Sequence, residues 1–513
     1  MTTIIVSGAI FRQNVDFYLE KAFLASVQHA QRQHFLPNNQ YLSGSVRLVS
    51  RQEKQELSSI VCDLLKSGCR ALVGPSDPRI SVILESIATS VAIPYFAIAP
   101  LAHPPEGQYT ISMYPPANYM INAIKSIILK WRWKSYFFIY EEPYSLVLWQ
   151  NLFSAYQLHE VRLHIFQAKT RNFLKAFQLV RSAGCENVIL ALSNQSIRPA
   201  LMTAMKLGLI NSRVRFLLTT LDITTLDLEP FRHNYARISG LNIVSLKSAH
   251  GSAGLWSKDK LFAGLKDDGN KSKTTNDIQR HFPLTEVALV RDAVFAFARG
   301  YMNASALWQS LLTSADANRQ GSNIDQNLEY PEICQSRYIG GTISDRRRLS
   351  HNANAETLLN YITYSGVPDG LSGDVIFDGQ QRTEISLEFH QLNYDGVLEK
   401  IGTWDPYLTS MDAKNNTEAW SHEGTLKLER LKPHLKATTI LERPYVMLKR
   451  DHASHSGNDR FEGFCVDLLR RLSADLDFTF TLQTVADNKY GNLDDNGKWN
   501  GMIGEILRGV RVN

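Results

Sequence analysis

The chain has 513 residues, of which 44% are hydrophobic and 20% are charged. This composition is typical of a globular protein and excludes a disordered chain, and the length predicts more than one compact domain. The 55 Lys and Arg residues exceed the 50 Asp and Glu residues only slightly. Because no segment concentrates this positive charge, the sequence gives no reason to expect a nucleic-acid partner.

The beginning of the chain, MTTIIVSGAIFRQ, lacks the basic start and small-residue cleavage site of a signal peptide, so we interpret it as a strand. The best membrane-span candidate, SVAIPYFAIAPLA, is short and is interrupted by Pro94 and Pro100, so we expect no membrane span in this chain. Five cysteines are too few for a disulfide scaffold and lack zinc-site spacing. Four asparagines begin N-x-S/T sequons and are glycosylation candidates if the protein is secreted: Asn194, Asn270, Asn303 and Asn415.

Short β-branched and aromatic runs alternate with helical segments before residue 100. In chain order, the runs are TIIVSGAI, SVRLVS, RALVG and IPYFAI. Strands that alternate with helices predict a parallel sheet. Between the second and third runs, QEKQELSSIVCDLLKSG carries an apolar stripe at helical spacing and ends at Gly68. We therefore expect an amphipathic helix packed on this sheet.

A second series of the same kind follows the WRWK segment. Its runs are SYFFIYEE, VRLHIF, NVILALS and RFLLTT, and a further helical run, LTEVALVRDAVFAFARG, comes later. After Gly370, Asp-Gly turns at Asp378 and Asp395 predict antiparallel hairpins. Two doubly wound lobes that the chain visits more than once predict an α/β clamshell over residues 1–405, with a cleft where ligands of such folds bind.

The composition changes after Trp404. Residues 406–436 are polar and poor in long apolar runs, so we interpret them as a linker. A new unit begins at Ala437 with ATTILERPYVMLKR, and residues 437–513 are expected to form an incomplete domain.

Motifs of enzymes, cofactors and metals are missing or defective, so we expect no enzyme activity, no cofactor and no metal. The sequence has no GxGxxG after a strand and no P-loop, and GLSGD at 370–374 lacks the last glycine of a hydrolase elbow. The histidines of HEVRLH, His159 and His164, are five residues apart and point in different directions on a helix. Near the end of the chain, a calcium-like loop has Ile503 where its bidentate glutamate should stand.

Three segments near the end of the chain resemble one known family. ATTILERPYVMLKR, GNDRFEGFCVDLLRRLSADLDFTF and VADNKYGNLDDNGKWNGMIGEI are similar, in this order, to the first ligand-binding segment of ionotropic glutamate receptors of the kainate-like branch. Upstream, GLSGDVIFDGQQR and GVLEKIGTW resemble the end of that family's amino-terminal domain. The resemblance implies a bilobed type I periplasmic-binding-protein-like clamshell, followed by a linker and a partial type II periplasmic-binding-protein-like domain.

The resemblance also implies site residues. In the family, the tyrosine of the KYG motif packs over bound glutamate, which corresponds to Tyr490, and the glutamate of the TILExPYV motif lies at the cleft, which corresponds to Glu442. By themselves, an exposed aromatic and a solvated carboxylate would be the simpler interpretations. The family's arginine that binds the α-carboxylate comes after the segments matched here, so we expect residues 1–513 alone not to bind glutamate with receptor-like affinity.

The family carries a disulfide between two regions that correspond to Cys62 and Cys334, and the resemblance therefore implies this bridge. We expect Cys62 to face away from the apolar stripe of its helix. Cys69, Cys185 and Cys465 are expected to be free thiols in apolar settings.

The resemblance further implies partners and a location. We expect other receptor subunits, arranged as a dimer of dimers and paired mainly through helices of the first lobe, and L-glutamate in the full-length receptor. The implied location is the extracellular side of the postsynaptic plasma membrane, with membrane contact only through segments outside this chain. The alternative is a secreted small-molecule binding protein, whose ligand-binding candidate would be GPSDP at 74–78, although this segment is more simply interpreted as a helix cap.

Overall fold

The structure, a computed structural model, falls into two compact units, residues 1–428 and residues 429–513. It describes residues 3–33, 40–50, 57–155, 158, 160–169, 172–234, 236–244, 284–316, 345–393, 395–406, 425–428, 434–476, 479–493 and 497–507. Among the described helices, none combines the length and apolar character that a membrane crossing requires.

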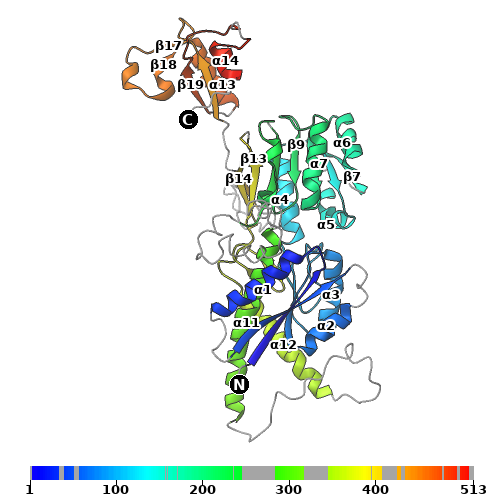
Figure 1. Cartoon of the computed structure of the whole chain (residues 1–513). Coiled ribbons are helices and arrows are strands. Elements are labelled where there is room, and N and C mark those ends of the chain that lie inside the picture. The colour runs from blue at the N-terminus through cyan, green and yellow to red at the C-terminus, as the bar shows by residue number, and fades with distance from the viewer. Residues whose placement is uncertain are drawn as a thin grey trace. The chain divides into compact units, whose positions relative to one another are not determined.

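The first lobe of the larger unit is built on a seven-stranded sheet with the order β11-β12-β5-β4-β3-β1-β2 (Figure 1). Its strands are β1 (Thr3–Arg12), β2 (Gln40–Val49), β3 (Cys69–Val73), β4 (Tyr95–Ala97), β5 (Thr110–Ser112), β11 (Ile376–Asp378) and β12 (Gln381–Thr383). The first five strands are parallel, as the alternation of strands and helices predicts. One face is covered by α2 (Leu57–Lys66) and α3 (Pro78–Val91), and the other by α1 (Phe17–Arg32), α11 (Leu284–Asp316) and α12 (Asp345–Ser365).

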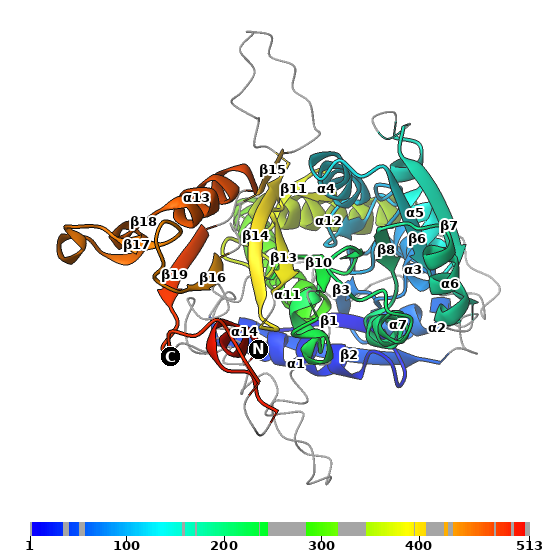
Figure 2. The same ribbon diagram turned by 90° about the horizontal axis from the view of Figure 1, so that it is seen from above.

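The second lobe is built on an eight-stranded sheet with the order β15-β14-β13-β10-β9-β8-β6-β7 (Figure 2). Its strands are β6 (Ser135–Tyr140), β7 (Arg162–Gln167), β8 (Asn187–Ala191), β9 (Arg215–Leu218), β10 (Arg237–Asn242), β13 (Leu387–Leu392), β14 (Leu398–Asp405) and β15 (Thr425–Leu428). On one face lie α4 (Ala117–Lys130) and α5 (Tyr144–Phe153), and on the other α6 (Phe173–Ser182) and α7 (Asn194–Lys206). Two 3₁₀ helices, η4 (Ile223–Thr225) and η5 (Glu229–Phe231), complete this lobe.

The local sequence explains most of these elements. In α2, the apolar stripe buries Leu57, Val61 and Leu64, and the chain leaves the helix through Gly68 at φ +87°. The two Asp-Gly turns connect β11 to β12 and β13 to β14, and both glycines have positive φ. The predicted hairpins and the two-lobed α/β fold are therefore confirmed.

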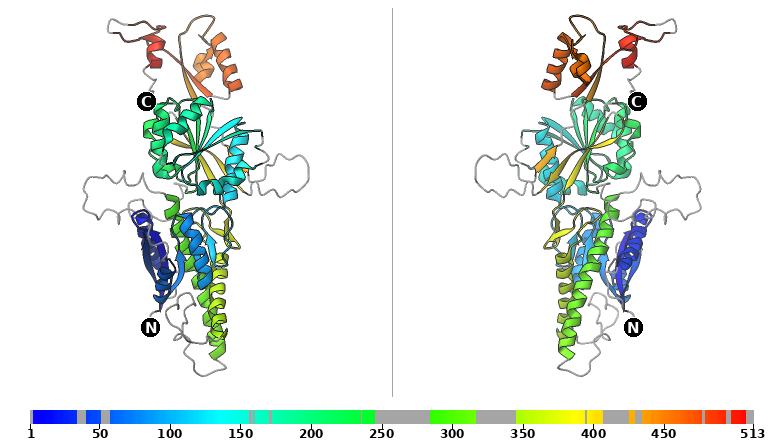
Figure 3. Two further views of the ribbon diagram at one scale, coloured as in Figure 1. Left: turned by 90° about the vertical axis from the view of Figure 1, so that its right-hand side faces the viewer. Right: turned by 90° about the vertical axis from the view of Figure 1, so that its left-hand side faces the viewer.

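The chain passes between the lobes more than once. It leaves the second sheet after β10, forms the antiparallel helix pair α11 and α12 in the first lobe (Figure 3), and returns to the second sheet at β13. The two helices approach closely at Gly300, where a Cβ would lie 2.6 Å from the Cα of Ile362. Strand β15 lies within the range that the sequence predicts as a linker, and it pairs with the edge strand β14.

The smaller unit contains a parallel strand pair and two longer helices. Its elements are β16 (His434–Thr439), β17 (Met447–Leu448), η7 (His452–Ser454), η8 (Gly457–Arg460), β18 (Phe461–Glu462), α13 (Phe464–Leu476), β19 (Thr479–Thr484) and α14 (Gly501–Leu507). Its small core buries Val446, Phe461, Val466 and Leu482. Phe480 packs against this core, whereas Ile506 is 67% exposed and Phe478 lies outside the described residues.

Candidate functional site

In the smaller unit, the loop that carries Tyr490 is held in place by the first turn of α14. The backbone N–H of Ile503 donates to the Tyr490 carbonyl at 3.2 Å, and the N–H of Met502 donates to the Lys489 carbonyl at 3.0 Å. Asp487 accepts from the N–H of Gly501 at 2.8 Å, and this bond lowers the pKa of the Asp487 carboxyl. Tyr490 itself is 61% exposed. The local fold thus fixes the backbone of this loop and leaves the aromatic face open.

A glycine is required where α14 begins. Gly501 has φ +65°, and a Cβ there would lie 2.3 Å from the Lys489 carbonyl oxygen. Since α14 starts at this residue and its N–H is bonded to Asp487, the KYG and NGM segments form one connected turn.

Glu442 lies in a tight turn that follows β16. Its backbone pairs with Val446 in both directions, with N···O distances of 2.9 Å each. The side chain is exposed. Among the described residues, no hydrogen bond or ion pair joins the side chains of Glu442 and Tyr490, so the site roles of these two residues stay predictions.

α14 also connects this turn to the strands of the smaller unit. The Glu505 carboxylate accepts from the Thr438 hydroxyl at 2.7 Å and from the Ala486 N–H at 3.2 Å. Thr438 is on β16, and Ala486 follows β19. A single carboxylate on α14 therefore connects this helix to both strand segments of the small sheet.

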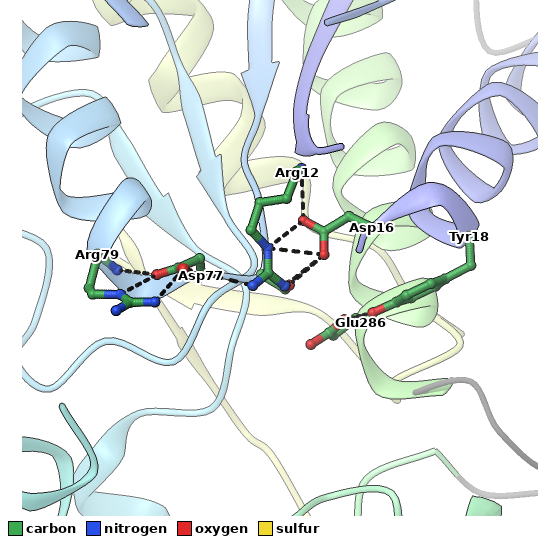
Figure 4. A network of polar contacts seen from close by, with 7 residues as sticks. Arg12, Asp16, Tyr18, Asp77, Arg79 and Glu286 are labelled. Atoms are coloured by element: carbon green, nitrogen blue, oxygen red, sulfur yellow. Dashed lines mark hydrogen bonds and ion pairs between the residues drawn. The ribbon is translucent and has the colours of Figure 1, made fainter. Parts of the chain in front are cut away.

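In the larger unit, charged side chains gather where β1 and β3 end, at the edge where ligands of parallel sheets commonly bind (Figure 4). The Arg12 guanidinium donates to the Asp16 carboxylate at 2.7 Å and to the Ser76 hydroxyl at 2.5 Å. Asp77 lies 3.7 Å from Arg12 and 3.0 Å from Arg79. These charges neutralise one another within the first lobe.

The polar groups of GPSDP belong to this network. Asp77 is the N-cap of α3 and accepts from the Arg79 N–H at 2.9 Å, which is the helix-cap interpretation favoured by the sequence. The Ser76 hydroxyl donates to Asp16 at 3.0 Å. Because these groups bond to each other, they do not form the set of free donors that an amino-acid ligand would need.

Glu286, near the start of α11, is the most perturbed acid of this region, and the Tyr18 hydroxyl donates to it (Figure 4). Part of the residue reaches solvent, but its carboxyl group is enclosed, and this burial raises the pKa of Glu286 to about 7. The negative charges of Asp16 and Asp222 also raise this pKa, whereas the Tyr18 hydrogen bond and Arg12 lower it. This site could not be predicted from the sequence, because Glu286 is one acid in an otherwise ordinary helical run.

Several contacts join the two lobes beside this network. The Tyr144 hydroxyl accepts from the Ala102 N–H at 3.0 Å, and Asp222 accepts from the Thr285 N–H at 2.8 Å. Arg79 lies 3.7 Å from Glu142, but both side chains are exposed, so this pair contributes little. The two hydrogen bonds are thus the stronger connection between the lobes.

The cysteines partly match the expectations. Cys62 is disulfide-bonded, and Cys69, Cys185 and Cys465 are free. Cys334 lies outside the described residues, so the pairing of Cys62 with Cys334 stays a prediction. Two expectations about environment are wrong: Cys62 is buried although it lies away from the centre of the apolar stripe, and Cys465 is exposed.

Two of the four sequon asparagines are described, and both side chains have partners. Asn194, at the start of α7, accepts from the Thr220 hydroxyl at 2.7 Å. Asn303, within α11, donates through its amide nitrogen to the Ser365 hydroxyl at 2.8 Å. Glycosylation at Asn303 would replace one of the two hydrogens on this amide nitrogen, because it is the atom modified. Asn270 and Asn415 lie outside the described residues. Within the described part of the chain, no group of three or more potential ligands could hold a metal ion.

Two family models match the chain in succession. The model described as "Receptor family ligand binding region" matches residues 18–395, which include most of both lobes. The model described as "Ligated ion channel L-glutamate- and glycine-binding site" matches residues 433–511, which include Glu442 and Tyr490. Each model therefore falls within one of the two compact units.

Two similar relatives carry the name "Glutamate receptor ionotropic, kainate 1", one from Homo sapiens and one from Macaca fascicularis. Each is 27% identical to this chain over 499 residues, which cover 95% of this chain and 51% of the relative. The chain thus spans about half the length of the curated relatives it matches.

Proposed function

Because this chain belongs to the ionotropic glutamate receptors, in their kainate-like branch, we propose that it is extracellular sequence of a glutamate-gated cation channel subunit. The observation that carries this proposal is the order of the two matches, 18–395 and 433–511, on two separate compact units. This order is that of a receptor with an amino-terminal clamshell followed by an agonist-binding domain, rather than that of an enzyme.

We propose that the clamshell directs subunit assembly. Two arginines and two aspartates at the carboxyl strand ends of its first lobe, Arg12, Arg79, Asp16 and Asp77, neutralise one another, which favours a structural role over recognition of a free amino acid. The partners would be other receptor subunits, in a dimer of dimers, at the extracellular side of the postsynaptic membrane. Sedimentation of the chain should show dimers at tens of micromolar, because dimers with modest interfaces are populated at this concentration. A strict monomer would contradict this role.

We propose that Tyr490 and Glu442 belong to one wall of a glutamate site. The fixed backbone of the Tyr490 loop and the open ring support this role, since a rigid aromatic can pack over a ligand at little entropic cost. A chimera tests it: residues 433–511 replace the matching region of the human relative, and glutamate-evoked current is recorded.

In this chimera, Tyr490→Ala should raise the half-maximal glutamate concentration about tenfold or more, as expected when a contact worth about 1.4 kcal/mol is lost. Tyr445→Ala is the matched control, because Tyr445 is also exposed but lies in the turn beside β17. Equal effects of the two substitutions would refute the assignment of Tyr490.

A further inference from the structure

A cavity of about 210 Å³ opens in the second lobe, and its lining is unusually basic for a position beside an apolar core. It is lined by Trp131, Arg215, Arg237, Ser239 and Gln391. Arg215 and Arg237 are the first residues of β9 and β10, so the cavity lies at the amino ends of these strands. The Arg12 network of the first lobe lies at carboxyl strand ends, so the two regions occupy opposite edges of their respective sheets.

Strand register places the polar lining on one face of the sheet. Arg215 and Arg237 are direct partners across the parallel pair β9 and β10. Ser239 is two residues beyond Arg237, and its partner across the antiparallel pair is Gln391 on β13, the neighbour of β10 (Figure 2). Because side chains alternate along a strand, these four share one face. The same face of the sheet carries the apolar core under α4. Near the end of this helix, the face carries these polar side chains instead.

Trp131, the residue after α4, forms the apolar part of the lining. The Arg215 guanidinium lies 5.9 Å from its ring centroid, a cation–π distance. The ring also contacts Phe389 at a centroid distance of 5.5 Å and Trp133 at 6.0 Å. Trp131 is therefore held in position by the core, and it orients the Arg215 side chain.

Among the described residues, no carboxylate lies within ion-pair distance of either guanidinium group. Burial lowers the pKa of Arg215, the charge of Arg237 lowers it further, and Glu186 opposes the shift only in part. Two like charges on neighbouring strands repel each other, so an anion bound between them would remove an unfavourable interaction.

We propose that this cavity binds a doubly charged tetrahedral oxyanion, a phosphate or sulfate group. Two guanidinium groups supply the planar paired donors that such oxygens prefer, and the Ser239 hydroxyl and Gln391 amide supply neutral donors beside them. A dianion matches the two charges at one place, whereas a monocarboxylate neutralises only one. The group can be a free ion or part of a larger molecule. This site is independent of the proposed glutamate and assembly functions.

Calorimetry on the intact chain tests the proposal, with sodium phosphate, sodium sulfate and sodium acetate compared at equal ionic strength. Phosphate or sulfate should bind saturably with a Kd on the order of 1 mM, and acetate should bind at least about tenfold more weakly. Arg237→Gln should weaken the dianion about tenfold or more, and Arg237→Lys should weaken it less, because it keeps the charge but loses the paired donors. Glucose 6-phosphate is titrated in parallel. Tighter binding of glucose 6-phosphate than of phosphate would identify a phosphate group carried on a sugar as the preferred ligand, rather than the free ion.

The matched control is Arg213→Gln, which removes the same charge from an exposed residue two positions before Arg215 and outside the cavity lining. Its affinity for phosphate should equal that of the unmodified chain. Thermal unfolding without added anion checks that the Arg237 variants are folded. The proposal is overturned if no dianion saturates the site, if Arg237→Gln binds as the unmodified chain does, or if Arg213→Gln weakens binding equally.

Discussion

At the scale of single residues, the carboxyl group of Glu286 is enclosed near the Tyr18 hydroxyl and the charges of Asp16 and Asp222. Its pKa is raised to about 7 from the ordinary 4.5, so the folded chain favours the protonated acid. Below pH 4.5, this carboxyl group is protonated in both the folded and the unfolded chain, so it does not lower the free energy of unfolding. The cost of ionisation grows as the pH rises from there, and it is complete above pH 7.

Glu286→Gln should therefore leave stability unchanged near pH 4 and increase it at pH 8, by on the order of 3 kcal/mol. Glutamine keeps the shape and can still accept from Tyr18 without ionising. Chemical denaturation at the two pH values measures the difference. Glu106→Gln, at an exposed carboxylate, is the control and should show no such pH dependence. Equal effects of Glu286→Gln at both pH values would contradict the prediction.

A second residue-scale prediction concerns Asp292, a fully buried acid on α11. It accepts from the Ser372 hydroxyl at 2.6 Å and from the N–H groups of Ser372 and Leu371 at 3.0 Å each. Asp292→Ala leaves these donors unpaired, and each such group costs about 1–3 kcal/mol, so we expect at least about 3 kcal/mol of destabilisation.

Denaturant titration measures this loss, and Asp63→Ala is the control. Asp63 is 60% exposed in a weak pair with Lys66, so its removal should change stability by less than about 1 kcal/mol. A similar loss for both variants would show that the buried network is not what stabilises this region. The serine of GLSGD, Ser372, is thus buried in a structural contact.

At the scale of elements, the α14 turn depends on Gly501. Gly501→Ala would place a Cβ 2.3 Å from the Lys489 carbonyl oxygen, so we expect the turn to open and the Tyr490 loop to lose hydrogen-exchange protection. Gly497→Ala is the control: its φ is also positive, at +72°, but no atom lies within 4 Å of the added Cβ. It should cost only about 1 kcal/mol of backbone strain. Unchanged protection in Gly501→Ala would contradict the prediction.

Most elements of the two lobes could be predicted from the sequence, because their apolar periodicity is strong and their turns use Asp-Gly. The missed strands are short or atypical: β5 has three residues, and β10, RISGLN, contains a glycine and several polar residues. The sequence predicts a linker at β15, because this strand lies in a polar segment and forms only by pairing with β14. Such pairing is tertiary information that a local pattern does not carry.

At the scale of the whole molecule, the disulfide at Cys62 is the longest-range covalent link we predict. Pairing with Cys334 would close a loop of more than two hundred residues, and such a bridge typically adds about 2–4 kcal/mol of stability. Non-reducing peptide mapping should find Cys62 joined to Cys334, and reduction should lower the thermal midpoint. Finding Cys62 paired with any other cysteine, or free in secreted protein, would contradict the prediction.

The candidate sites were less predictable than the fold. The site roles of Tyr490 and Glu442 could be predicted only through the family resemblance, because an exposed aromatic residue and an exposed acid carry no local sequence signal of their own. The Arg12 network could not be predicted, because its residues lie on β1, on the following turn and before α3, and only the sheet brings them together. The same holds for Arg215 and Arg237, which are 22 positions apart in the chain and are neighbours only across strands.

The length of α11 has a mechanical consequence. Its first turns belong to both lobes, since Ala288 packs in the core of the second and Leu289 in that of the first. Its 33 residues, at about 1.5 Å each, extend about 50 Å from this point. The helix can thus rotate as a rigid rod about its first turns, where the chain crosses between the lobes. A rotation of only about 5° there would move its far end by about 4 Å, so a small change in the cleft becomes a larger displacement at the opposite end of the first lobe.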